Sequence, residues 1–143
     1  MSFLARAALA LTCMTMLASS GCGAVGGGPK KVVINERVCS TVTFLRMTVG
    51  QTSRVVLDAS GGSEGAQSMS FRMEDFPLTV KGAVPPNSTL GDPYSTITLT
   101  AQTGDEASVD VVPTLSGTYT AVCGVVTAGR IVAKDITFQI LPG

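Results

Sequence analysis

The side chains of this chain that we weigh first for chemistry are its four cysteines and ten acidic residues, because the chain holds no histidine. Without imidazole, the commonest general base and the Ser–His and Cys–His dyads are excluded. The adjacent acids Glu74 with Asp75 and Asp105 with Glu106 fall in predicted turns, and neighbouring side chains on a strand point to opposite faces. Neither a phosphate-binding glycine loop nor a Gly-x-Ser-x-Gly nucleophile elbow occurs. We therefore expect a protein that is not an enzyme.

The balance of positive and negative residues argues against a nucleic-acid partner. Ten Lys and Arg residues offset ten Asp and Glu residues, and only 14% of the 143 residues are charged. Nucleic-acid binding needs a basic patch with a strong positive field, so we expect no nucleic-acid partner. The length suits one domain.

The first 21 residues have the composition of an export signal. Arg6 precedes an apolar run over residues 7–18, which is shorter than the roughly 20 residues that a membrane-spanning helix needs. Small residues at 19–21 then lead directly to Cys22. A basic start, a short apolar middle and small residues are typical of a secretory signal peptide.

The stretch Ser19-Ser20-Gly21-Cys22 resembles the lipobox of bacterial lipoproteins, with Ser19 where that pattern usually has Leu. The resemblance implies that residues 1–21 are a lipoprotein signal peptide and that the Cys22 sulfur carries diacylglycerol. Acyl chains would hold the protein firmly on a membrane. We expect an extracytoplasmic protein of the bacterial cell envelope, located for example in the periplasm. Its lipid anchor would lie in the inner or the outer membrane. Ordinary secretion and an uncleaved anchor are the alternatives.

Residues 22–31 are rich in glycine and lack periodicity, which predicts a flexible tether. Residues 32–143 instead alternate apolar and polar positions in short runs, most clearly at 95–101, 107–112 and 135–140. In the first run Ile97, Leu99 and Ala101 would face a core. Other candidate strands are 31–34, 38–45, 52–57, 68–73, 78–80, 117–127 and 130–133. Short strands separated by Gly and Pro turns, without a helical stripe, predict an all-β antiparallel sandwich.

Residues 113–123, Pro-Thr-Leu-Ser-Gly-Thr-Tyr-Thr-Ala-Val-Cys, resemble the Pro-x-x-x-Gly-x-Tyr-x-x-x-Cys strand that binds copper in cupredoxins. Residues 47–52 and 104–111 resemble two other cupredoxin segments, so the likeness covers about residues 31–141. It implies an antiparallel Greek-key sandwich of the cupredoxin type. An immunoglobulin-type adhesion domain is disfavoured, because its Tyr lies two residues before the Cys, whereas Tyr119 lies four before Cys123.

The departures of this sequence from the cupredoxin pattern predict that the usual copper site is absent. A blue-copper site needs two imidazoles and a thiolate, and this chain offers only the thiolate of Cys123. Met69 stands where the first ligand histidine would be, and residues 124–130 hold neither His nor Met. We therefore expect a cupredoxin-like lipoprotein without a cofactor.

Cys39 and Cys123 remain once Cys13 leaves with the signal and Cys22 is acylated. An even pair in an oxidising compartment favours a disulfide, and a cupredoxin-like fold would place both near one pole. A free buried pair is an alternative. So is a Cu(I) site of Cys123 and Met69, because sulfur ligands favour that ion.

These expectations define a membrane-anchored binding or accessory module with a protein partner of unknown identity. Loops on a rigid sandwich are the usual place for contacts, and a tether raises the effective concentration at a membrane assembly. The alternative function is copper handling or electron transfer through an atypical Cys and Met site.

Overall fold

The computed structural model describes residues 28–41, 44–61, 66–86, 88–90 and 96–143. The expected signal peptide at 1–21, the lipidation of Cys22 and most of the expected tether lie outside the described residues and stay predictions. Among the described residues, no helix is long and apolar enough to cross a membrane.

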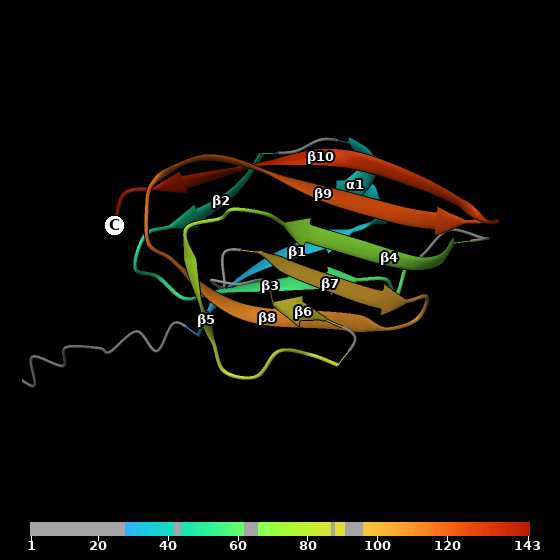
Figure 1. The fold of residues 1–143 in the computed structure, drawn as a ribbon, viewed down its shortest axis with the longest axis horizontal. Helices are drawn as coiled ribbons and strands as arrows, with labels where there is room; N and C mark the ends of the chain where they lie inside the picture. The colour runs from blue at the N-terminus through green and yellow to red at the C-terminus, as the bar shows by residue number, and fades with distance from the viewer. Residues whose placement is uncertain (1–27, 42–43, 62–65, 87, 91–95) are drawn as a thin grey trace, which may run out of the picture.

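The described chain is mostly strand, in two layers, with one short helix (Figure 1). In order, its elements are β1 (Lys30–Asn35), α1 (Glu36–Thr41), β2 (Phe44–Thr48), β3 (Ser53–Asp58), β4 (Ala66–Met73), β5 (Leu78–Lys81), β6 (Thr89–Leu90), β7 (Ile97–Gln102), β8 (Glu106–Pro113), β9 (Gly117–Thr127) and β10 (Arg130–Leu141). The all-β class is therefore confirmed.

The two sheets are mixed. Sheet A has the order β1-β3-β8-β5, and sheet B has the order β2-β10-β9-β4-β7-β6. The β1–β3 and β2–β10 pairs are parallel, so the expectation of a purely antiparallel sandwich is wrong. The reason is that β2 returns in sheet B, which leaves β1 and β3 running the same way in sheet A. The other pairs given by the register are antiparallel.

The core lies between the inner faces of the sheets, and strand alternation fills it as predicted. Ile97, Leu99 and Ala101 are buried on β7. Three aromatic side chains pack together in the core: Phe138 lies 5.9 Å from Phe71 in a tilted pair and 5.4 Å from Phe76 in an edge-to-face pair, between ring centroids. Such ring pairs add to the hydrophobic stabilisation of burial.

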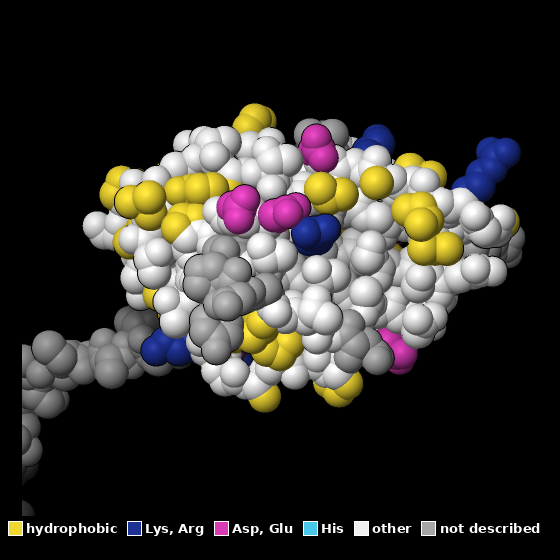
Figure 2. Space-filling model, in the orientation of Figure 1, with side chains coloured by type: hydrophobic (Ala, Val, Ile, Leu, Met, Phe, Trp, Pro, Cys, Tyr) yellow, Lys and Arg dark blue, Asp and Glu magenta, His cyan; other side chains and the backbone are white. Residues whose placement is uncertain are grey.

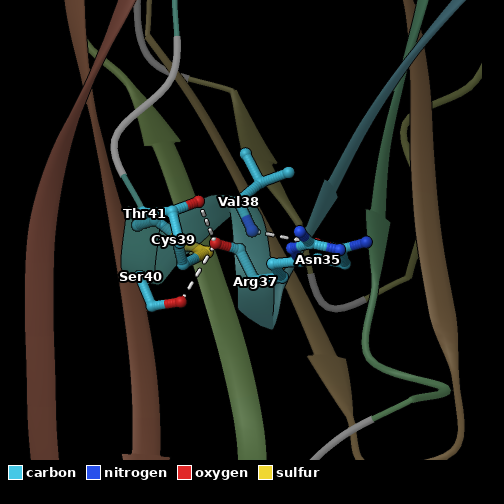
Figure 3. Close-up of a disulfide and its surroundings, with 7 residues drawn as sticks. Asn35, Arg37, Val38, Cys39, Ser40 and Thr41 are labelled. Atoms are coloured by element: carbon cyan, nitrogen blue, oxygen red, sulfur yellow. Dashed lines mark hydrogen bonds between the residues drawn. A yellow bond between two sulfur atoms is a disulfide. The ribbon is translucent and has the colours of Figure 1, made fainter.

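The prediction of a strand over 38–45 is wrong, because residues 36–41 form α1. Asn35 caps this helix, since its side-chain oxygen accepts a hydrogen bond from the Val38 N–H at 2.9 Å. The hydroxyls of Ser40 and Thr41 donate to the Arg37 carbonyl (Figure 3). A helix of six residues is too short to show a periodic stripe in sequence. The two strands predicted over 130–140 form one continuous strand, β10.

The sandwich has two unlike ends. At the Lys30 end, the Lys30 N–H donates to the Thr52 carbonyl at 3.2 Å, and the Val49 N–H donates to the Leu141 carbonyl at 2.9 Å. At the hairpin end, β9 turns into β10 through Ala128 and Gly129. Figure 1 shows the hairpin end on the right and the C-terminus on the left.

Candidate binding site at the hairpin end

A disulfide joins Cys39 of α1 to Cys123 of β9, which confirms the predicted pairing. The two Cα atoms are 5.6 Å apart, within the ordinary range for a disulfide. Both residues are buried, and 84 positions separate them. On the chain-entropy account, closing a loop of that length stabilises the fold by about 4 kcal/mol. The bridge therefore fixes α1 against sheet B (Figure 3).

The structure places Met69 on β4, buried on the same inner face as Cys123. The register opposes Met69 to Val125 and Phe71 to Cys123, so Met69 is a diagonal neighbour of Cys123. The Cys123 sulfur is bonded to Cys39, and a thiolate ligand would require that bond to be reduced. In the described ranges, no cluster of three or more His, Cys, Asp or Glu residues could hold a metal ion. The Cu(I) alternative stays a prediction.

A small recess of about 160 Å³ opens beside the disulfide, between α1 and the inner face of the hairpin. Its lining residues are Glu36, Cys39, Ser40, Val125, Thr127, Val132 and Lys134. Lys134 closes one side, because its Nζ donates to the Ser40 carbonyl at 2.6 Å near the end of α1. Ligand pockets usually measure about 300–1,000 Å³, so this recess suits one side chain of a partner better than a small molecule.

The hairpin also presents an open strand edge. β10 pairs with β2 only from Thr137 onward, and within the described residues β9 is the only strand that pairs with positions 130–136. Helix α1 lies beside this part of β10, where the Lys134 side chain reaches the Ser40 carbonyl. Ile131 and Val132 are 73% and 55% exposed. Figure 2 shows a group of hydrophobic side chains toward this end. An edge strand offers unpaired N–H and C=O groups to another chain.

The turn at the tip has an unusual residue. Ala128 and Gly129 have φ values of 46° and 77°, the positive pair of a type I′ turn. Glycine adopts this conformation readily, but alanine does so at a cost of about 1 kcal/mol. The hairpin therefore keeps a strained alanine where Asn would be favoured.

The structure keeps the predicted carboxylate pairs apart. Glu74 and Asp75 follow β4 at the Lys30 end, where Glu74 accepts a hydrogen bond from Arg72 at 3.0 Å. Asp105 and Glu106 precede and begin β8 at the hairpin end. The strands thus place the pairs at opposite ends of the sandwich.

The strongest ion pair lies on the outer face of sheet A, far from the recess. Arg54 donates through Nε and Nη2 to the two carboxylate oxygens of Asp110, at 2.7 and 2.9 Å. This hydrogen bonding lowers the pKa of Asp110 and raises the pKa of Arg54. The Ser60 hydroxyl, followed by the Ser60 backbone N–H, lowers the pKa of Asp58 on the same sheet.

Sequence reasoning missed the recess and the open edge. Glu36, Ser40 and Lys134 carry no motif, and only the fold brings α1 beside β10. The one available signal was Gly129 between two apolar strand runs, which is typical of a hairpin turn.

No protein-family model matches the chain, and no curated protein matches its sequence. Two solved structures resemble it weakly. The crystal structure of the cysteine protease inhibitor EhICP2 from Entamoeba histolytica has a TM-score of 0.40 at 13% identity, covering 82% of this chain and 100% of that one. The solution structure of amebosin has a TM-score of 0.32 at 14% identity, covering 81% of this chain and 100% of that one. Both scores are too low to transfer a function.

Proposed function

We propose that the protein is a lipid-anchored, non-catalytic binding module of the bacterial cell envelope, facing the extracytoplasmic side. The lipobox-like residues before Cys22 support the anchor. The disulfide between Cys39 and Cys123 fits an oxidising compartment, where such bonds form and persist. We further propose that the sandwich is a cupredoxin-like domain without a blue-copper site. Tyr119 and Cys123 on β9 support this, because they keep the spacing of the cupredoxin strand.

The partner is a protein segment in extended conformation, which pairs with the open edge of β10. One observation carries this proposal: Ile131 and Val132 are exposed on a strand whose positions 130–136 have an unpaired edge among the described residues. Adding a strand to such an edge gives affinity through main-chain hydrogen bonds, and side-chain pockets give specificity. The recess beside Val132 would take one apolar side chain of the added strand.

Site-specific crosslinking in intact cells tests this mode of binding. A photo-reactive amino acid in place of Ile131 should yield one discrete heavier adduct. The matched control carries the same amino acid in place of Thr79, which is exposed on sheet A. A second probe replaces Val122, which is exposed on β9 next to β10. The variant Ile131→Lys should reduce the adduct from this probe without changing stability, since surface changes usually stay within about 0.5 kcal/mol. Recovery of the monomer alone from the Ile131 probe, or equal adducts from both positions, contradicts the proposal.

The anchor has a separate test. The intact mass of detergent-extracted protein should show diacylglycerol on Cys22 and a gain of two hydrogen atoms after reduction of the disulfide. An unmodified Cys22 contradicts the anchor and leaves the crosslinking result interpretable.

A further inference from the structure

The outer face of sheet A aligns four charged residues that are far apart in sequence. The register pairs Lys31 with Arg54, Arg54 with Asp110, and Asp110 with Lys81. These pairings form one row across β1, β3, β8 and β5, close to the Lys30 end. We call it the sheet A cationic row.

The row has a net positive charge because its only acid is already neutralised. Asp110 is held by both guanidinium contacts of Arg54. Lys31 and Lys81 are exposed, and neither forms an ion pair within the described residues. Lys30 adds a further exposed cation beside the row.

The other end of the same face is acidic. Asp58 on β3 lies opposite Glu106 on β8, and Asp105 directly precedes Glu106. The ordinary pKa of Asp58 is 3.8 and hydrogen bonds from Ser60 lower it further, so its carboxylate is charged at neutral pH. Sheet A therefore carries positive charge toward the Lys30 end and negative charge toward the hairpin end.

We propose that the sheet A cationic row lies against an anionic lipid surface and orients the sandwich with its hairpin end away from the membrane. The inference rests on the lipid anchor of the proposed function. Lys30 lies eight positions after Cys22, and eight steps along a fully extended chain span at most about 29 Å. The anchor thus keeps Lys30, Lys31 and the row near the headgroups, whereas Asp58, Asp105 and Glu106 are repelled by them.

The attraction between the row and an anionic leaflet is strong enough to orient an anchored domain. Each Lys or Arg near an anionic leaflet strengthens binding about fivefold, and the attraction decays within a Debye length of about 8 Å. Two lysines are too few to bind a membrane firmly by themselves. Added to an anchor that already holds the domain at the surface, they suffice to select one orientation.

Amine footprinting of the acylated protein in vesicles tests the orientation. One set of vesicles is phosphatidylcholine alone, and the other is phosphatidylcholine with phosphatidylglycerol. A water-soluble reagent acetylates exposed lysines, and mass spectrometry measures the acetylation of each lysine. Lys31 and Lys81 should lose reactivity only in the anionic vesicles, by about fivefold, and recover at high salt. Lys134, on sheet B, is the internal control and should react equally in both vesicles. Equal reactivity of Lys31 and Lys81 in both vesicles overturns the proposal and assigns the row to a protein partner.

Charge variants supply the second test. Lys31→Gln with Lys81→Gln should weaken binding of the non-acylated mature chain to the anionic vesicles by about 30-fold at low salt. The control, Arg37→Gln with Arg46→Gln, removes the same charge from exposed positions on α1 and β2 and should leave binding unchanged. Equal losses in the two double variants contradict the proposal. Because this test needs no acyl chain, it separates failure of the row from failure of the anchor.

Discussion

The two ends of the sandwich differ in how β10 is paired. Backbone hydrogen bonds close turns at both ends, such as the one from the Gly50 N–H to the Pro113 carbonyl at 2.9 Å and the one from the Gly104 N–H to the Ala59 carbonyl at 3.0 Å. At the Lys30 end, β10 also pairs with β2. At the hairpin end, β10 extends past β2 with exposed apolar side chains and a strained Ala128. A disulfide ties α1 to β9 beside this extension. The contrast indicates that a covalent bridge supplies stability where β10 has a paired strand on one side only.

Breaking the bridge should have the largest effect. Cys39→Ser with Cys123→Ser should lower the free energy of unfolding by about 4 kcal/mol, because the unfolded chain regains the entropy of an 84-residue loop. Urea denaturation measures the loss. If the disulfide stabilises mainly the hairpin end, the amide hydrogen-exchange rates of the double variant should rise most at α1 and the hairpin. They should rise least near Val49 and Leu141.

The control is the oxidised protein treated with reductant, which should lose the same stability, whereas the double variant should not respond to reductant. A uniform rise in exchange at both ends would show that the bridge supports the whole sandwich and does not serve one end.

The sequence predicted those features that depend on local alternation. β9 was predicted with the bounds found, and Ile97, Leu99 and Ala101 were placed correctly in the core, because period-two burial is visible along one strand. The Cys39–Cys123 pair followed from counting cysteines and from the compartment. These inferences did not require knowing which strands are neighbours.

Features that depend on neighbours could not be predicted. The parallel β1–β3 pair arises because β2 lies in the other sheet, which no local pattern records. Ile131 is exposed although its side chain is apolar, and it lies in the part of β10 before the pairing with β2 begins at Thr137. The cationic row joins Lys31 and Lys81 only through two intervening strands. α1 depends on one cap and one disulfide.

Relieving the strain at the hairpin tip should have a smaller effect. Ala128→Asn should raise the free energy of unfolding by about 1 kcal/mol, because Asn tolerates the positive φ that a type I′ turn requires. Urea denaturation is the measurement, and Ala133→Asn on β10 is the matched control, at a position where we expect no gain. A loss of stability in Ala128→Asn, or equal shifts in both variants, would mean that the turn is unstrained.

The smallest effect on stability concerns the Lys30 end, where Asp110→Asn removes the carboxylate that pairs with Arg54. A carboxyl group whose pKa is lowered by folding contributes stability above its ordinary pKa of 3.8, and this contribution is lost as the pH falls through the lower folded value. The variant should therefore be less stable than the parent at pH 7, with a gap that closes below pH 3.8. The gap is small because the Arg54 side chain is 42% exposed and solvent screens the pair.

The same substitution separates stability from membrane attraction. Asp110→Asn leaves Arg54 without its counter-charge between Lys31 and Lys81, so binding to phosphatidylglycerol vesicles should strengthen about fivefold while stability falls. Glu74→Gln is the matched control, because it also removes an acid from an ion pair at this end, but one outside sheet A. Stronger vesicle binding in both variants would show that net charge, and not the row, attracts the lipid. Opposite changes in stability and lipid binding, found only for Asp110→Asn, would identify this end as the one built to meet a charged surface.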